Sequence, residues 1–243
     1  MILKIAGCDK FINFQNNSLN VLFIPEVDEL FNFVSLFRKE IEEETEVLTF
    51  FDSDKKLKLD IEVDLQTDLF SLTLNQKKLI TWLHKKILKE NSNSETMFNF
   101  NKVKETILNW LNELKTSTLI DFAYLEDLEN TDILKLMKVQ FKEKEETLFD
   151  RFMNFLDTIL EVKKVKLLFV SFLYAYFSES EITQIKNICE EGEITLVSLE
   201  KDKPEFINNN TKVIKYFNGD VLDWNFLHQK VYNVCRKALN LCF

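Results

Sequence analysis

Glycine and proline are nearly absent from this chain, which has three Gly and two Pro in 243 residues. Typical proteins contain about 7% Gly and 5% Pro, so glycine-built loops are scarce here. A P-loop and a dinucleotide fingerprint both need glycines that bring backbone N–H groups close to phosphate. The first strand-to-helix junction instead reads Ile-Pro-Glu-Val-Asp, and its Glu26 and Asp28 would repel phosphate. The sequence therefore predicts that no nucleotide is bound.

Side chains that commonly carry catalysis or bind zinc are also few. The chain has no H-E-x-x-H, G-x-S-x-G or C-x-x-C motif. Its only histidines and cysteines are His84, His228, Cys8, Cys189, Cys235 and Cys242. Carboxylates alone remain for chemistry, and 40 acidic residues make close pairs unavoidable by chance. We predict that the protein is not an enzyme; the alternative is a degenerate nuclease or NTPase that uses Glu26 and Asp28.

Long apolar segments are missing as well. The longest, near 165–177, is interrupted by Lys166 and Ser171 and is shorter than the roughly 18 residues that a membrane span needs. The first seven residues are followed by Cys8, Asp9 and Lys10, which is not the pattern of a signal peptide. These features predict a soluble cytoplasmic protein with reduced thiols and no membrane contact.

Both ends of the chain have the pattern of an α/β sheet. Strands are predicted at 2–6, 10–14, 20–24, 47–51, 165–171, 193–199 and 213–217. Ser178 and Glu181 form a capping-box signature for a helix that ends near Cys189. This strand–helix–strand order predicts a right-handed parallel crossover. Further helices are predicted at 28–43, 145–161 and 224–241.

The middle of the chain has helical spacing instead. Helices are predicted at 74–90, 103–114 and 131–139, with a polar loop at 91–99. The predicted fold class is therefore α/β, with a sheet-based head formed by residues 1–55 and 147–243. A helical leg domain, residues 56–146, is inserted into this head.

Lysines are concentrated in the predicted leg. Lys78, Lys85 and Lys89 lie at i, i+7 and i+11 on one helical face, flanked by Lys77 and Lys86. Lys135 and Lys138 follow on a later helix. The net charge of −9 argues against nucleic acid on average, but a local lysine stripe can still follow a phosphate backbone. A plain solvated helix face is the other interpretation of the same pattern.

Acidic residues gather before the helix at 131–139. They are Glu126, Asp127, Glu129 and Asp132. Carboxylates at this density suit Ca²⁺, which takes six to eight oxygen ligands, although EF-hand spacing is absent. Acids favoured by the macrodipole at a helix N-terminus are the alternative interpretation.

Several segments, taken in order, resemble one known family. Phe50-Phe51-Asp52 resembles its FFD segment, and the helix 133–138 resembles its ILxLIK helix. Residues 64–69 with the helix after them resemble its VTD segment and first leg helix. Residues 147–149 with 163–170, and the strand 193–199, resemble its TIF…KKLLIFVN and LTVLFLE segments. Over roughly residues 11–217 the chain thus resembles the Csn-type ring protein of type II-A CRISPR systems, and residues 218–243 are an extension beyond the usual family pattern.

This resemblance implies a head of degenerate ABC-ATPase-like, P-loop-like fold that has lost its nucleotide site. It also implies a homotetrameric ring, structural Ca²⁺ and sequence-independent binding of double-stranded DNA, especially ends. The implied role is spacer acquisition in antiviral defence, beside the CRISPR integrase and the type II effector nuclease. The leg lysines then become phosphate contacts, and Asp127 and Glu129 become the first candidates for Ca²⁺. A protein-interaction scaffold without direct DNA binding is the alternative, with Trp82, Trp110 and the Phe-rich faces serving partners.

Overall fold

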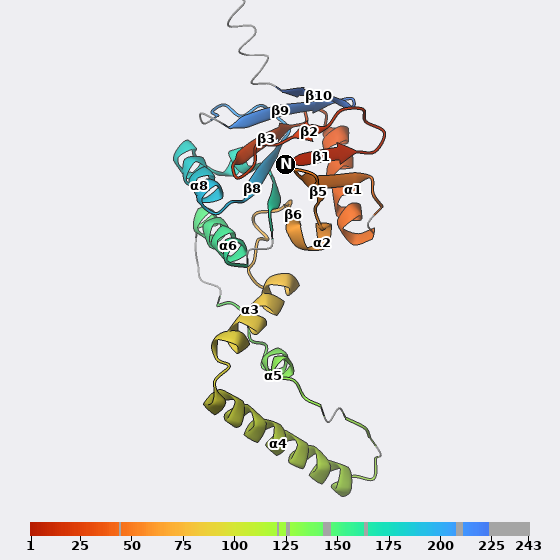
Figure 1. The fold of residues 1–243 in the computed structure, drawn as a ribbon, viewed down its shortest axis with the longest axis vertical. Coiled ribbons are helices and arrows are strands. Elements are labelled where there is room, and N and C mark those ends of the chain that lie inside the picture. Colours follow the sequence, from red (N-terminus) through yellow and green to blue (C-terminus); the bar gives the residue numbers. More distant parts are fainter. Residues whose placement is uncertain are drawn as a thin grey trace, which may run out of the picture. The chain divides into compact units, whose positions relative to one another are not determined.

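The protein is described by a computed structural model (Figure 1). It describes residues 1–43, 45–120, 122–124, 127–142, 147–162, 165–207 and 211–223. The chain divides into two compact units. The head unit comprises the described residues from 1 to 72 and from 147 to 223, and the leg unit comprises those from 73 to 142. None of the described helices is long and apolar enough to cross a membrane.

A six-stranded sheet forms the centre of the head unit, in the order β10-β9-β3-β8-β7-β6. Its strands are β3 (Leu19–Phe23), β6 (Val63–Gln66), β7 (Leu167–Ser171), β8 (Thr195–Glu200), β9 (Lys212–Phe217) and β10 (Asp220–Asp223). All pairs are parallel except β9 with β10. β7 and β8 are buried along their whole length. β7 is accordingly apolar except for Ser171, whereas β8 also buries Thr195, Ser198 and Glu200.

A second, antiparallel sheet of four strands has the order β2-β1-β4-β5. It consists of β1 (Ile2–Ile5), β2 (Ile12–Asn13), β4 (Leu48–Asp52) and β5 (Lys55–Lys56). Helix α1 (Val27–Glu43) shares the core with both sheets. The Phe37 ring lies 4.8 Å from that of Phe169 in β7 and 5.1 Å from that of Phe50 in β4. Part of the high Phe content is therefore used to join α1 to the two sheets.

Four more helices complete the head unit: α2 (Leu59–Glu62), α6 (Leu148–Val162), α7 (Leu173–Tyr176) and α8 (Glu179–Glu191). In Figure 1, α6 and α8 lie together on the side of the large sheet opposite α1. α6 buries one apolar face, including Phe152, Phe155, Leu156 and Ile159. The predicted strand–helix–strand unit is confirmed, because β7 and β8 are parallel neighbours with α8 between them in sequence.

The capping box predicted for α8 is also confirmed. The backbone N–H of Ser178 donates to Glu181 Oε2 at 2.7 Å, and the Ser178 hydroxyl accepts from the backbone N–H of Glu181. We expect Ser178→Ala to lower the free energy of unfolding by about 1 kcal/mol, since an N-terminal N–H loses its acceptor. Thermal unfolding should check this, with Gln184→Ala on the exposed face of α8 as control. A melting temperature equal to that of wild type would contradict the role of the cap.

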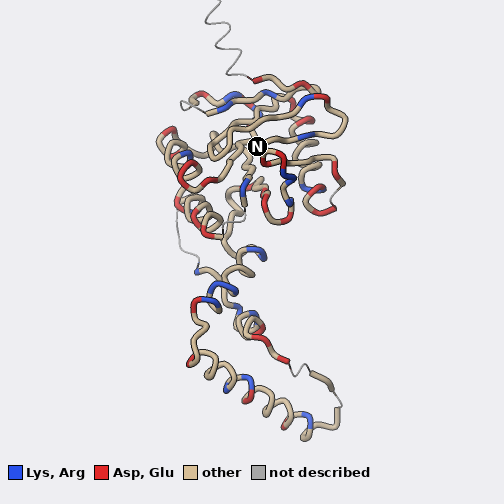
Figure 2. The backbone as a smooth tube through the Cα atoms, viewed as in Figure 1, with Lys and Arg blue, Asp and Glu red and all other residues tan. Residues whose placement is uncertain are grey.

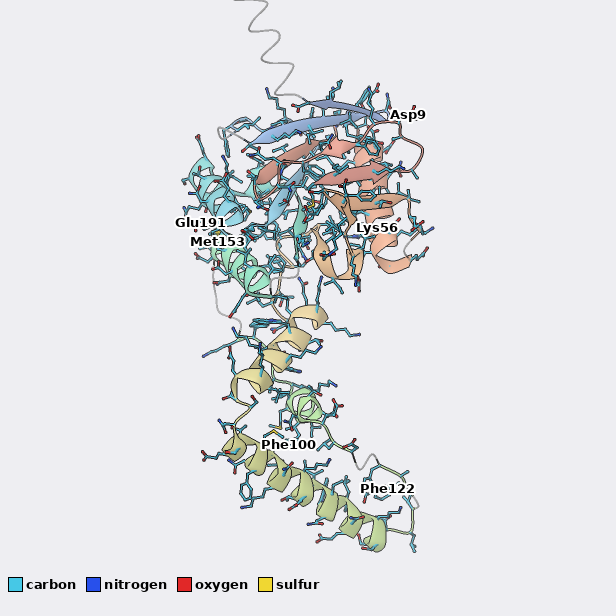
Figure 3. The ribbon with its side chains drawn as sticks, viewed as in Figure 1. Asp9, Lys56, Phe100, Phe122, Met153 and Glu191 are labelled. Carbon is cyan, nitrogen blue, oxygen red and sulfur yellow. The ribbon has the colours of Figure 1, made fainter. Side chains whose placement is uncertain are left out.

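The leg unit contains α3 (Lys77–Glu90), α4 (Ser94–Ser117) and α5 (Asn130–Leu136), and α3 contacts α5. His84 on α3 is buried, and its Nε2 lies 2.7 Å from the Val139 carbonyl oxygen. The described residues of α4 include none that is buried. The segment after α4 returns along it: Lys104 forms an ion pair with Asp127, and Tyr124 donates to Asn112. Phe100 and Phe122 mark α4 and this return segment in Figure 3.

Several predictions differ from the structure. The predicted leg domain begins at residue 56, whereas β6 pairs with β7 and places residues 56–72 in the head unit. The loop predicted at 91–99 is wrong from residue 94 onward, because α4 begins at Ser94. Strand β10 was not predicted; it follows a turn in which Asn218 and Gly219 have positive φ. The helix predicted at 224–241 lies outside the described residues.

Candidate nucleic-acid interface

Helix α3 presents a row of exposed residues with spacing of four. Lys77, Thr81, Lys85 and Lys89 are all exposed, whereas Leu79 and His84 are buried. At 1.5 Å per residue, the row from Lys77 to Lys89 is about 18 Å long. Figure 2 shows this helix as a place where basic residues follow one another closely.

Two of the predicted α3 lysines, Lys78 and Lys86, are less exposed to solvent. Lys86 is half-buried; its Nζ lies 3.9 Å from Glu90 Oε1 and 5.0 Å from the centre of the Trp82 ring. Lys78 is also half-buried. The face predicted from sequence spacing is therefore rotated slightly in the structure, so that Lys77 replaces Lys78 in the exposed row.

Lys135 and Lys138 lie on α5 and in the turn after it. Both are exposed. Lys135 Nζ is 3.0 Å from Asp132 Oδ1, and Lys138 has a backbone φ of 51°. Because α3 and α5 contact each other, these lysines and the α3 row belong to one packed part of the leg unit.

Charge is distributed unevenly along the chain. Residues 73–145 carry 12 Lys and 11 Asp or Glu, a net charge of +1, so the rest of the sequence carries −10 and the total is −9. Within that region, α3 alone has five Lys and one Glu. Positive potential is thus localised on one helix, which is the arrangement that phosphate binding requires.

The acidic residues proposed for Ca²⁺ are engaged in local structure. Glu129 and Asp132 form a capping box at the start of α5, and Asp127 Oδ1 lies 3.2 Å from Lys104 Nζ. The hydrogen bond from Lys135, followed by that from the Glu129 backbone, lowers the pKa of Asp132. Glu126 lies outside the described residues. Where the chain is described, no three His, Cys, Asp or Glu residues are grouped as metal ligands.

The junction where an NTPase would hold phosphate connects β3 to α1. β3 ends at Phe23 and α1 begins at Val27, and both Glu26 and Asp28 are exposed. At the end of β7 stands Ser171, where a Mg²⁺-binding carboxylate would be expected. The residues present at this junction therefore do not fit a nucleotide with its Mg²⁺.

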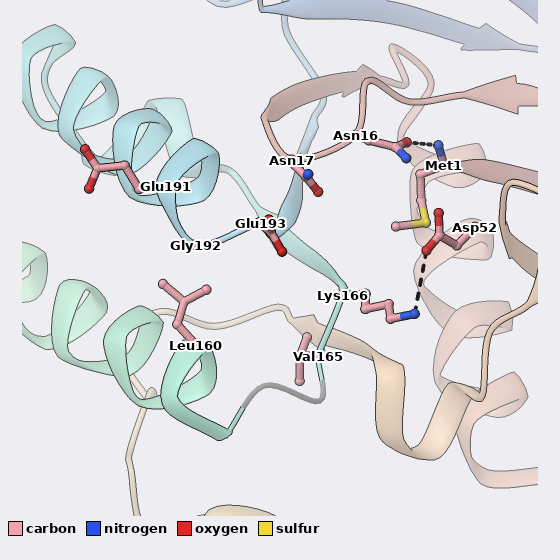
Figure 4. A pocket seen from close by; sticks show the side chains of 10 residues that line it. All are labelled: Met1, Asn16, Asn17, Asp52, Leu160, Val165, Lys166, Glu191, Gly192 and Glu193. Carbon is pink, nitrogen blue, oxygen red and sulfur yellow. Dashed lines mark hydrogen bonds and ion pairs between the residues drawn. The ribbon is translucent and has the colours of Figure 1, made fainter.

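A polar pocket of about 720 Å³ lies at the amino ends of the parallel strands (Figure 4). Asn17, Lys166 and Glu193 line it just before β3, β7 and β8, respectively. Lys166 Nζ is 3.2 Å from Glu62 Oε1 and 3.6 Å from Asp52 Oδ2. Its hydrogen bond with Glu62, more than its contacts with Asp52, raises the lysine pKa. Lys166 is thus neutralised within the head, and the neighbouring Lys163 and Lys164 lie outside the described residues.

Sequence reasoning overlooked one exposed group in the head unit. Phe70, in the loop after β6, and Tyr176, at the end of α7, form an exposed pair of aromatic rings. Arg151 on α6 donates to the Phe70 carbonyl. The sequence could have pointed to Arg151 in this group, since the chain has only three Arg (38, 151 and 236) among 31 basic residues.

The two sheets, their covering helices and the helical insertion define a mixed α/β protein with two units. A sequence model of the CRISPR-associated protein Cas_Csn2 matches residues 40–215. This match covers most of the chain, and the chain therefore belongs to the Csn2 family of CRISPR-associated proteins.

The fold is similar to that of Stu0660 of Streptococcus thermophilus, whose crystal structure matches with a TM-score of 0.62 and 12% sequence identity. That alignment covers 96% of this chain and 80% of the other. At this identity the likeness concerns the fold alone. A comparison with curated protein sequences gave no match.

Proposed function

We propose that this CRISPR-associated protein is a non-catalytic, sequence-independent DNA-binding protein that acts in spacer acquisition. The observation that carries the proposal is the exposed row Lys77, Lys85 and Lys89 on an otherwise partly buried helix. Such a row supplies positive charge along one exposed part of the helix and no group arranged to recognise base edges. Contacts of this kind go to phosphates and carry no sequence information.

The proposal extends to a homotetrameric ring in the cytoplasm that holds double-stranded DNA, especially its ends. Self-assembly is supported by α4, where Phe100, Val103, Ile107, Trp110 and Leu114 follow a spacing of three and four residues. Val103 and Trp110 on this seam are 45% and 57% exposed, and we assign the face to a second copy of the chain. Four copies would collect four α3 rows, so that DNA meets a cationic surface despite the acidic composition.

The same proposal includes structural Ca²⁺ and an ABC-ATPase-like head that has lost its nucleotide site. It also includes action beside the CRISPR integrase and the type II effector nuclease. The residues at the β3–α1 junction support the second of these points, since they do not fit a nucleotide. For Ca²⁺, support comes only from the density of carboxylates in the sequence around Asp127 and Glu129.

The salt dependence of DNA binding tests the proposal directly. With a linear duplex of mixed sequence and Ca²⁺ supplied, we expect the logarithm of the binding constant to fall linearly with the logarithm of salt concentration. The expected slope is about −0.9 for each phosphate contacted, and two unrelated sequences should bind alike. The oligomer mass should be measured in the same buffer. A protein that binds no DNA at low salt, but co-purifies with a partner protein, would favour the scaffold alternative.

A further inference from the structure

Phe70 and Tyr176 form an exposed aromatic pair in the head unit. Phe70 is 64% exposed and Tyr176 is 41% exposed, and their ring centres lie 5.2 Å apart at an interplanar angle of 88°. Among the described aromatic side chains of the head, only Phe11, Phe31, Phe70 and Tyr176 are exposed. Two adjacent rings left in solvent are therefore unusual for this unit, and they have apolar surface available for a ligand.

The backbone that carries Phe70 is held from two sides. The Phe70 N–H donates to Asp68 Oδ1 at 2.9 Å, and Ser71 donates to the second oxygen of the same carboxylate. Arg151 Nη1 donates to the Phe70 carbonyl oxygen at 3.1 Å. Phe70 thus stands on a fixed turn, although its ring is open to solvent.

The short helix α7, which ends at Tyr176, is held in place by hydrogen bonds to buried side chains. The N–H of Tyr174 donates to Glu200 Oε1 at 3.0 Å, and the N–H of Leu173 donates to Ser198 Oγ at 3.3 Å. Ser198 Oγ in turn donates to Glu200 Oε1 at 2.5 Å. Both supporting residues are buried in β8. The two rings are therefore presented by rigid elements, which reduces the entropy lost when a ligand binds.

The position of the pair is also informative. Phe70 follows β6 and Tyr176 follows β7, and these strands are parallel neighbours. The rings accordingly stand beyond the carboxyl ends of the sheet, where open α/β proteins usually bind their ligands. We propose that Phe70 and Tyr176, with Arg151 beside them, form a docking site for an unpaired nucleobase at a DNA end. This inference rests on the DNA binding proposed above.

The chemistry of the site fits a nucleobase better than a phosphate group or a protein partner. A phosphate would meet the Asp68 carboxylate next to Phe70, whereas a neutral base can stack on an aromatic ring and a guanidinium group. A stable protein interface buries about 800 Å² on each partner. The exposed neighbours of Phe70 in its loop, Asp68 and Ser71, are polar, and Leu69 and Leu72 are buried, so this loop has little apolar surface for a protein partner beyond the Phe70 ring.

The test uses the full chain and a duplex with a short overhang whose terminal base is 2-aminopurine. Stacking on the pair should quench this base in the complex, and an internal 2-aminopurine should not respond. Phe70→Ala should remove the quenching and reduce the preference for overhang ends over closed circular DNA by about tenfold. Phe70→Tyr should retain both. Phe31→Ala, which removes another exposed ring of the head, is the matched control.

The outcomes separate this inference from the proposed function. DNA bound by wild type without terminal quenching, or with quenching that survives Phe70→Ala, overturns the base site and leaves DNA binding in place. Absence of any DNA binding would remove the proposed function itself. If Phe70→Ala leaves end binding unchanged but dissociates the oligomer, the pair is a subunit contact and the base site is rejected.

Discussion

Replacement of Lys77, Lys85 and Lys89 together by Glu is expected to weaken DNA binding by roughly 100-fold near 100 mM salt. Each lysine is exposed and stands in the α3 row, so each can approach a phosphate without first leaving a buried position. Reversal of charge removes the attraction and adds repulsion. The slope of the binding constant against salt should also become shallower by about 1 for each phosphate that the variant no longer neutralises. Titration of a labelled duplex at several salt concentrations measures both quantities.

A matched control distinguishes a site from a general effect of charge. Lys4, Lys55 and Lys201 are exposed residues of the head unit, and their replacement by Glu changes the net charge by the same amount. We expect this control to retain most of the affinity and nearly the full salt slope. Equal losses in the two triple variants would mean that binding follows total charge, and the α3 row would lose its assigned role.

Much of the head could be predicted because its strands are marked by local patterns. The apolar run of β7 and the Ser178 capping box define β7-α8-β8 without knowledge of other segments. β6 is different, since Val63–Gln66 contains two polar residues and becomes a strand only by pairing with β7, about 100 residues later. Because its partner strand is distant in sequence, this segment alone has no clear strand pattern. The first part of the predicted head therefore ended at residue 55, before β6.

In the leg unit, polar sequence was misread as loop. The first turn of α4 is exposed and has no apolar periodicity, but the Asn93 side chain accepts from the Thr96 N–H at 2.8 Å and begins the helix there. The lysine stripe was predicted in outline, because helical periodicity is reliable once the helix is known. Which lysines are open depends on tertiary burial, so the difference between Lys77 and Lys78 could not be inferred from spacing.

Glu40 gives the largest stability effect that we expect in the head unit. Its side chain is buried, with 1% of the residue exposed, and it accepts hydrogen bonds from four donors. These are the Thr45 hydroxyl and the N–H groups of Glu46, Val47 and Leu48, at 2.6 to 3.3 Å. The carboxylate thereby holds the turn between α1 and β4. Glu40→Ala would leave several donors without a partner, and we expect a loss of about 3–5 kcal/mol in the free energy of unfolding.

Urea denaturation followed by circular dichroism should measure this loss. Glu42→Ala is the matched control, because Glu42 is an exposed carboxylate two residues away. We expect the control to change the unfolding free energy by less than about 0.5 kcal/mol. A similar, small effect of both substitutions would show that water replaces the Glu40 carboxylate without penalty.

The ionised form of Glu40 makes the same contribution dependent on pH. Burial opposes ionisation, but the hydrogen bonds from Thr45, Leu48, Glu46 and Val47 outweigh it and lower the pKa of Glu40. Because the pKa of Glu40 is lower in the folded state than in the unfolded state, ionisation stabilises the fold. This stabilisation is complete at pH values above the unfolded-state pKa of about 4.3, and it is lost as the pH falls through the folded-state pKa. Glu40→Gln cannot ionise, so its deficit relative to wild type should be full at pH 7 and shrink below about pH 4. A deficit that stays constant down to pH 3 would mean that shape, and not charge, is what the turn requires.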